Sequence, residues 1–158
     1  LTGQQDINIS DNIIEFFLVD FIKKTRTVYK DRNFYQAQTK EKMSFVNNTA
    51  KAKIEDFINN KTNTDEVLRN QKSISVEIES FVKIDTNKYQ LNFIERTYSQ
   101  NGIPERESKY TMVAFLDYVP VSSNAMVRMN PLGIIIKDAE FGIVSTTQSQ
   151  VQTAPVTQ

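Results

Sequence analysis

Carboxylate and lysine side chains must carry whatever chemistry this chain performs, because its 158 residues include neither histidine nor cysteine. Histidine is the commonest general base near neutral pH and the commonest metal ligand, while cysteine supplies disulfides and thiolate ligands for zinc and iron–sulfur sites. Ser–His and Cys–His nucleophile systems are therefore excluded. The sequence also has no metal-ligand cluster and no glycine-rich phosphate loop, so we expect neither a metal nor a cofactor.

Two sets of residues come closest to an acid/base site. Glu77 and Glu79 stand two apart in "SISVEIES", and neighbouring carboxylates divide their pKa values between an acid and a base. The same alternation is typical of the solvated face of a half-buried sheet, which is the simpler interpretation. Asp117 in "VAFLDYVP", with Tyr110 or Tyr118 as donor, would suit an isomerase if it lay in a pocket. An alternative function is therefore a small-molecule-binding or isomerase-like domain with its pocket around Asp117.

Basic residues interleaved with aromatic ones form a third candidate site. They follow one another closely along the chain: Lys23, Lys24, Arg26, Lys30 and Arg32, with Tyr29, Phe34 and Tyr35. Such a mixture grips single-stranded nucleic acid in other proteins. Because Lys plus Arg and Asp plus Glu both total 19, the net charge is zero, so contact through Lys23, Lys24 and Arg26 would be local. Cations at the end of a helix also complement its dipole without any ligand.

A helix must position this basic cluster. In "DNIIEFFLVDFIKKTRTVY" apolar residues recur every three or four positions, which predicts an amphipathic helix from Ser10 or Asn12. Asn12 with Glu15 resembles a capping box at its start. Ile13 and Phe16 lie beside the main apolar stripe and widen it. Either a second helix of the same chain or a second subunit would cover them.

The next segments are also helical. The pattern over 34–58 predicts either one long helix or two helices that break near 38–40, and it contains no glycine or proline. The polar stretch 59–71 follows as a connector with room for a single helical turn.

After Lys72 the apolar period changes from helical to two, which predicts strands. The first of these strands directs one set of apolar residues to one face: Ile74, Val76, Ile78, Val82 and Ile84. Turns at 85–88 and at Asn101-Gly102 separate it from strands over 89–98 and 108–119. The third strand, over 108–119, is apolar on both faces, as a central strand would be. A last strand is predicted over 134–144.

Helices followed by strands with short turns predict an α+β fold, in which N-terminal helices pack on one face of a curved four-stranded antiparallel sheet. By analogy this order fits the cone of the nuclear-transport-factor-two-like (NTF2-like) superfold. We expect one domain over 11–145, a flexible lead over 1–10 and a disordered polar tail over 146–158. No run approaches the roughly 20 apolar residues that a membrane span needs.

A stiff turn precedes the last strand. In Asn130-Pro131-Leu132-Gly133, proline fixes its own φ and pushes Asn130 toward extended geometry, while Gly133 can adopt positive φ. The turn is therefore pre-formed. It either joins two strands in fixed register or presents a rigid loop to a partner.

This turn, together with "IIEFFLVDFIKKTRTVYKDRNF" and "YQLNFIERTYSQNG", resembles the periplasmic domain of the TrbF-like and VirB-eight-type family, the bitopic inner-membrane proteins of type IV secretion and conjugation machines. The similarity extends from about Asp11 to Ile143. Asn130, Pro131, Leu132 and Gly133 match the family's turn, which is expected to shape a loop and groove for subunit contacts.

The resemblance implies a non-enzymatic scaffold. It also implies a membrane span preceding Leu1, a domain in the periplasm at the bacterial inner membrane, self-association as a dimer or larger oligomer, and contacts with other channel subunits. On the first helix, Ile13 and Phe16 are our candidates for self-association. Nucleic acid is an expected partner only if the basic cluster forms a surface.

Overall fold

The chain builds its helices first and its sheet second. The computed structural model describes residues 9–149, in which helices come in the order α1 (Asp11–Arg26), α2 (Arg32–Met43), α3 (Asn48–Asp56), the π-helical segment η1 (Phe57–Lys61) and α4 (Thr64–Arg69). The strands are β1 (Ser73–Asp85), β2 (Lys88–Tyr98), β3 (Pro104–Tyr118) and β4 (Ile134–Gln148), with helix α5 (Asn124–Met129) before the last. This order confirms the predicted α+β class.

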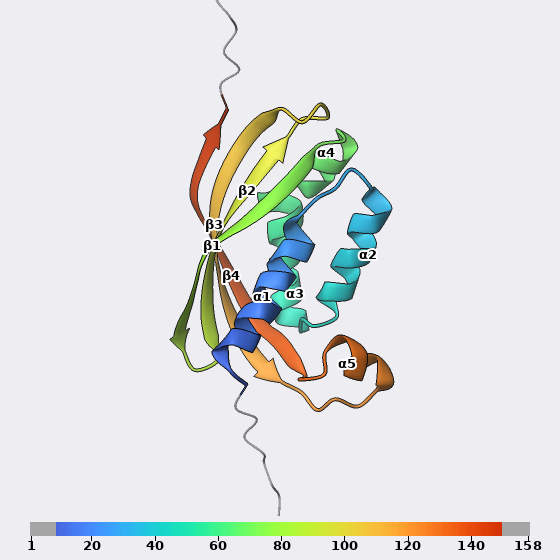
Figure 1. Ribbon diagram of the computed structural model, residues 1–158, viewed down its shortest axis with the longest axis vertical. Coiled ribbons are helices and arrows are strands. Elements are labelled where there is room, and N and C mark those ends of the chain that lie inside the picture. The colour runs from blue at the N-terminus through green and yellow to red at the C-terminus, as the bar shows by residue number, and fades with distance from the viewer. Residues whose placement is uncertain (1–8, 150–158) are drawn as a thin grey trace, which may run out of the picture.

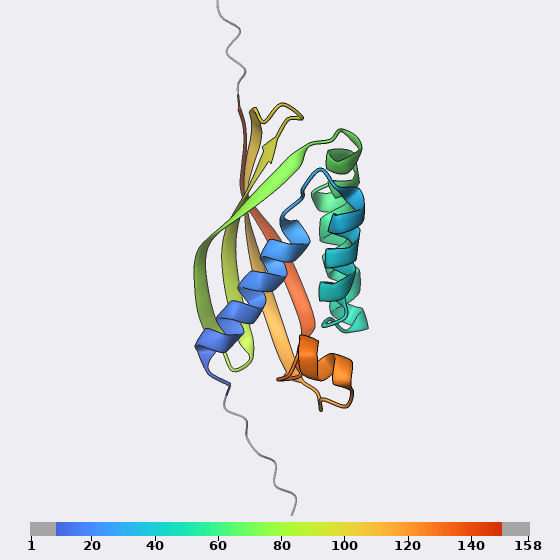
Figure 2. The ribbon, with the colours of Figure 1, turned by 45° about the vertical axis from the view of Figure 1, so that its right-hand side comes forward.

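The four strands form one antiparallel sheet in the order β1-β2-β3-β4, so β1 and β4 are its edges and β3 is a central strand, as predicted. The sheet is curved, and the helices lie on one face of it (Figure 1). Helix α1 crosses this face diagonally, α3 also packs against the sheet at β4, and α2 lies farther from the sheet against α1 (Figure 2).

The core lies between α1, α3 and the inner face of the sheet. The predicted stripe of α1 is buried at Ile14, Leu18 and Phe21, which are at most 2% exposed. On the sheet, alternate residues of the central strands pack against this stripe, among them Leu91, Phe93, Met112 and Ala114. Burying each large apolar side chain contributes about 1.5–3 kcal/mol, so this contact orients the helices on the sheet.

The boundaries of the first two helices differ from the prediction. Ser10, not Asn12, is the residue before α1, and no side chain caps this helix end. The long helical pattern is divided, but at 44–47 rather than near 38–40. Asn47 causes the division because its side chain accepts a hydrogen bond from the backbone N–H of Ala50 and so begins a new helix.

Strand β1 does not keep the predicted face along its whole length. Its register with β2 shifts between Ile78 and Ser80, which is a β-bulge. Beyond the bulge Phe81 packs against the core, whereas Val82 and Ile84 are exposed. The expectation that Val82 and Ile84 share the buried face was therefore wrong.

The ends of the domain also differ from the expected boundaries. Strand β4 continues to Gln148, and Thr146 pairs with Ser108, so the sheet includes residues assigned to the tail over 146–158. Ile9, assigned to the flexible lead, packs against the core. The remaining parts of both segments, 1–8 and 150–158, lie outside the described residues.

Candidate interaction surfaces and a buried ion pair

The turn at 130–133 is held by the side chain of Asn130 and by the backbone conformation of Gly133. The side chain of Asn130 is buried, donates to the carbonyl of Ile134 at 2.8 Å and accepts from the N–H of the same residue at 3.1 Å. Gly133 has a φ of +64°, and a Cβ there would lie 2.0 Å from the carbonyl oxygen of Val119. Only glycine fits this position, since both the conformation and the space exclude a side chain.

The other two residues of the turn face different surroundings. Leu132 is half-buried and packs against the core, whereas Pro131 is exposed. The structure thus brings the four predicted residues together as one pre-formed turn that follows α5. Of the four, Pro131 is the one whose side chain faces solvent.

The second surface of α1 is uncovered in this chain. Phe16 is 75% exposed and Ile13, three residues earlier, is 44% exposed. Helix α2 and the segment that follows it instead contact α1 on another side, where Phe17 lies 6.1 Å from Phe45 between ring centroids. The alternative in which a second helix covers Ile13 and Phe16 was therefore wrong.

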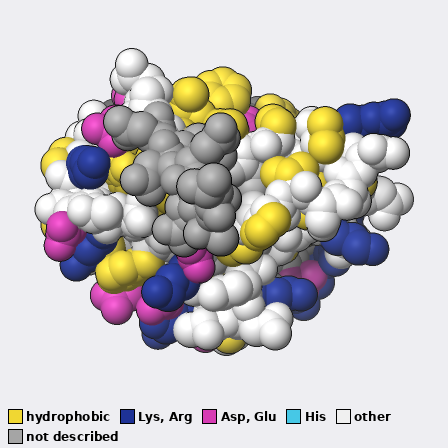
Figure 3. Space-filling view, turned by 90° about the horizontal axis from the view of Figure 1, so that it is seen from below, with side chains coloured by type: hydrophobic (Ala, Val, Ile, Leu, Met, Phe, Trp, Pro, Cys, Tyr) yellow, Lys and Arg dark blue, Asp and Glu magenta, His cyan; other side chains and the backbone are white. Residues whose placement is uncertain are grey.

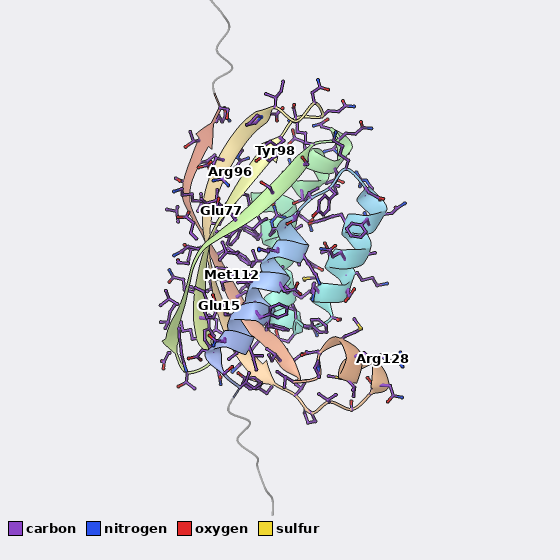
Figure 4. The ribbon with its side chains drawn as sticks, viewed as in Figure 1. Glu15, Glu77, Arg96, Tyr98, Met112 and Arg128 are labelled. Carbon is purple, nitrogen blue, oxygen red and sulfur yellow. The ribbon has the colours of Figure 1, made fainter. Side chains whose placement is uncertain are left out.

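Further hydrophobic side chains are exposed near α5, which the sequence did not predict because six residues are too short for a periodic stripe. They are Val119, Val127 and Met129. Seen from the end at which α1 begins, hydrophobic side chains appear in several places among charged ones (Figure 3). Arg128 extends from α5 at the same end (Figure 4).

One member of the basic cluster is removed from any nucleic-acid surface, because Arg26 is 1% exposed. Its guanidinium forms two hydrogen bonds of 2.8 Å to the carboxylate of Glu95 on β2 and a third of 2.8 Å to the hydroxyl of Thr64. It also lies 5.4 Å from the ring centroid of Phe57. Burial disfavours the charged form of Arg26, but the Glu95 carboxylate outweighs burial and raises the Arg26 pKa.

The remaining two residues of that candidate differ from each other. Lys24 pairs with Asp20 at 3.2 Å on the same helix, and Lys23 is exposed. The carboxylate of Asp20 also forms an ion pair with the ammonium group of Lys42 of α2, at 2.6 Å. Burial tends to raise the pKa of Asp20, but the hydrogen bonds from Lys42 and Lys24 outweigh it and lower that pKa.

The carboxylate pair in β1 belongs to a solvated face, as the simpler interpretation held. Glu77 accepts a hydrogen bond of 2.6 Å from Arg96 of the neighbouring strand, and Arg96 also donates to Glu107 at 3.0 Å. Glu79 lies 3.7 Å from the ammonium group of Lys109. Figure 4 shows Glu77 and Arg96 on neighbouring strands in the upper part of the sheet. Each carboxylate thus has its own cation, so the two do not act as a dyad.

The isomerase-like alternative fails on the position of Asp117. This carboxylate is exposed and accepts a hydrogen bond from the backbone N–H of Tyr118. Tyr110 is 2% exposed and packs with Phe57 and Phe93 inside the core. Tyr118 lines a hollow with Tyr89, and Asp117 is not among its lining residues in the described part of the chain. Within residues 9–149 no group of three acidic side chains is arranged to hold a metal.

A groove of about 740 Å³ runs between β4 and the helical segments α3 and η1. Its apolar part contains Phe57 stacked on Phe141, with ring centroids 4.1 Å apart and planes 10° from parallel. At one side Lys53 forms an ion pair of 2.8 Å with Asp138. The hydrogen bond from Lys53 is the main reason that the pKa of Asp138 is lowered.

Sequence reasoning missed Glu95 and Thr64 as partners of Arg26. A signal for Glu95 was present, because in "YQLNFIERTY" it shares the parity of Leu91 and Phe93 and so belongs to the inner face. A charged residue at an inward position needs a buried partner of opposite charge. Nothing in the sequence pattern identified that partner as Arg26.

Comparison with known proteins places these features in a family. The VirB8 family model, described as VirB8 protein, matches residues 2–139. Agrobacterium tumefaciens VirB8 has 13% identity and a TM-score of 0.67, with 89% of this chain and 93% of that chain covered. No curated protein sequence matches the chain.

Two further solved structures share the fold. The soluble domain of TrwG from the type IV secretion machinery of Bartonella grahamii has a TM-score of 0.72 at 13% identity, with 85% of this chain and 94% of that chain covered. The periplasmic domain of DotI has a TM-score of 0.67 at 12% identity, with 85% and 96% covered. These likenesses confirm the curved α+β cone.

No helix in the described part is long and apolar enough to cross a membrane. The family match over most of the chain shows that it belongs to the VirB8 family of type IV secretion system components.

Proposed function

We propose that this chain is a non-enzymatic assembly component of a type IV secretion or conjugative transfer channel, which associates with itself and bridges other channel subunits. Membership of the VirB8 family supports the assignment to the machine. We further propose that the domain lies in the periplasm, held at the bacterial inner membrane by a segment preceding Leu1. The fold shared with the periplasmic domain of DotI supports this location.

The observation that carries the self-association is Phe16. An aromatic side chain that is 75% exposed on a helix has a strong hydrophobic reason to be covered, and aromatic residues are enriched at the centres of protein interfaces. Ile13 lies about one turn earlier on the same side of α1 and extends the apolar surface. This surface suits a second copy, which yields a homodimer or a larger assembly.

The turn at 130–133 supports the bridging role. Asn130 and Gly133 hold its backbone by hydrogen bonds and by a conformation that only glycine tolerates, so Pro131 is presented without an ordering cost. Another subunit can bind a pre-formed loop of this kind without having to order it first. We therefore propose Pro131 as a contact residue and Asn130, Leu132 and Gly133 as its support.

Self-association is tested by analytical ultracentrifugation of the purified domain. Phe16→Asp should shift the chain from dimer to monomer across the micromolar range, because it places a charge in the interface. Ile103→Asp is the matched control, since Ile103 is 56% exposed in the hairpin at the opposite end of the molecule. If wild type is a monomer throughout, or both variants behave alike, the α1 surface is not the interface.

The role in transfer is tested in cells that lack the full-length gene. Wild type should restore transfer, whereas Phe16→Asp and Pro131→Ala should restore less, at unchanged protein level. Gly133→Ala is a poor probe of contact because it strains the turn itself. Transfer that does not depend on the gene would contradict the assignment to the machine.

A further inference from the structure

The two edges of the sheet are protected to different degrees. Natural proteins guard exposed edge strands with charged residues, prolines and bulges, because unpaired backbone groups invite another strand. Strand β1 has its bulge beside Ile78 and carries Glu77, Glu79, Lys83 and Asp85. Strand β4 has no charged residue from Phe141 to its end at Gln148. It also exposes Ile143 by 58% and Val144 by 64%. Strand β4 also has register shifts, at Lys137 and Val144. Its edge from Phe141 to Gln148 carries no charge, however, and is therefore the less protected one.

The register shows which backbone groups of β4 point to the open edge. The bonds from Val119 to Gly133 and from Ser149 to Glu105 show that odd-numbered residues of β3 bond toward β4. Between the two register shifts of this pair, Ala139, Phe141 and Ile143 oppose even-numbered residues of β3. In an antiparallel pair of strands, hydrogen-bonded residue pairs alternate with non-hydrogen-bonded ones. The N–H and C=O groups of Ala139, Phe141 and Ile143 therefore point away from β3. The N–H of Ala139 already donates to the carboxylate of Asp138 at 2.9 Å. In the described part of the chain, no backbone bond from outside the sheet reaches Phe141 or Ile143.

The same edge already accepts extended chain at its start. Ile136 donates its N–H to the carbonyl of Phe45 at 2.9 Å, and its carbonyl accepts from Asn47 at 3.1 Å, which forms a parallel bridge with Val46. Backbone pairing on this side of β4 is thus compatible with the helices that flank it. The pairing stops where α3 begins, and the groove along β4 continues beyond it.

The groove offers room for the side chains of an added strand. Ala139, Phe141 and Ile143 line it from the sheet, and Ala52 and Phe57 line it from the helical side. Alternate side chains of a strand point to the same face, so every second residue of an added strand would enter the groove. The charged lining residues cancel, with Lys53 and Lys61 against Asp56 and Glu140. The groove therefore suits a segment without net charge.

We propose that β4 binds an extended, uncharged segment of another channel polypeptide as a fifth strand at Phe141 and Ile143, with its alternate apolar side chains in the groove. This is strand addition, in which main-chain bonds supply affinity and side-chain pockets supply specificity. A second copy pairing β4 to β4 fits less well, because α3 stands beside this edge and the α3 of both copies would meet there. The inference gives the proposed bridging role a surface and rests on it.

The test uses purified domain and a synthetic probe, a fluorescent capped octapeptide of alternating valine and threonine. Wild type should bind it saturably in fluorescence anisotropy, and amide exchange should slow at Phe141 and Ile143. Ile143→Pro removes one outward N–H and should weaken binding by about tenfold, the effect of one hydrogen bond. Val144→Thr changes the neighbouring exposed residue, which does not line the groove, and keeps its N–H and a β-branched side chain. It is therefore the matched control and should bind within about threefold of wild type.

The same peptide with N-methyl groups on alternate residues is an independent probe that leaves the domain unchanged, and it should not bind. Three results would overturn the proposal: no saturable binding by wild type, equal binding of the methylated peptide, or exchange protection elsewhere. Self-association that Ile143→Pro abolishes would assign the edge to a second copy instead. Peptide binding does not depend on transfer in cells, so this proposal and the proposed function can fail separately.

Discussion

At the scale of single residues, Arg26 departs furthest from what its position in the sequence suggests. It stands among exposed basic residues at the end of a helix, yet it is one of the least exposed side chains of the domain. Its charge is tolerated because Glu95 and Thr64 together accept three of its hydrogen bonds. A buried pair of this kind ties the end of α1 to β2 and α4, and it removes Arg26 from any surface role.

Breaking the pair from one side should be costly. Arg26→Met leaves the Glu95 carboxylate buried without its partner, and we expect the free energy of unfolding in urea to fall by about 3–5 kcal/mol. The double variant Arg26→Met with Glu95→Leu should lose less, because no uncompensated charge remains. Lys23→Met on the same helix is the control and should change stability by less than about 0.5 kcal/mol. A double variant as unstable as the single one would show that packing, not charge, dominates.

At the scale of elements, periodicity predicted most of the fold but not its interruptions. The stripe of α1 and the alternation of β2 and β3 depend on many residues each, so single exceptions did not obscure them. The division at 44–47, the bulge near Ile78 and the helix α5 each depend on a few residues and on contacts with distant elements. The candidate site shows the same difference between local and distant features. The turn at 130–133 consists of four consecutive residues and could be predicted from them. The Arg26–Glu95 pair joins residues far apart in the chain, and the sequence pattern did not predict it.

The contact between α1 and α2 makes a prediction about pH. Lys42 of α2 and Lys24 hold the pKa of Asp20 below its ordinary value of 3.8, so the fold favours the ionised carboxylate. A lowered pKa contributes stability above the ordinary value that is lost as pH falls through the folded-state value. Asp20→Asn should therefore destabilise the domain at pH 6 and approach wild type below pH 3.8.

Chemical denaturation at several pH values checks this dependence. Glu41→Gln on α2 is the control, because Glu41 is exposed and has no cation within ion-pair distance among residues 9–149. Its difference from wild type should stay small at every pH. A difference for Asp20→Asn that grows as the solution is acidified would mean that the carboxylate is not stabilised by the two lysines.

At the scale of the whole molecule, the surfaces proposed for assembly are distributed along its length. Helix α1 begins at the same end as α5, and the hairpin between β2 and β3 marks the other end (Figure 1). If an anchor precedes Leu1, the end with α1 and α5 lies nearest the membrane. The edge of β4 extends away from that end and remains accessible to other polypeptides. Self-association and strand addition would then use different parts of one rigid domain.

The charge of the whole molecule argues that these partners are proteins. Positive and negative residues balance at 19 each. Of the three candidate residues, Lys23 is exposed, Lys24 pairs with Asp20 and Arg26 is buried. Affinity for single-stranded DNA depends on the number of phosphates that cations neutralise. Within this trio only Lys23 is exposed without an ion pair among residues 9–149, so the trio contributes little binding. We expect no shift of a single-stranded oligonucleotide by micromolar domain at about 50 mM salt. A salt-sensitive shift that Lys23→Ala with Lys24→Ala removes would show that the domain contacts nucleic acid after all, and would make the transferred strand itself one of its partners.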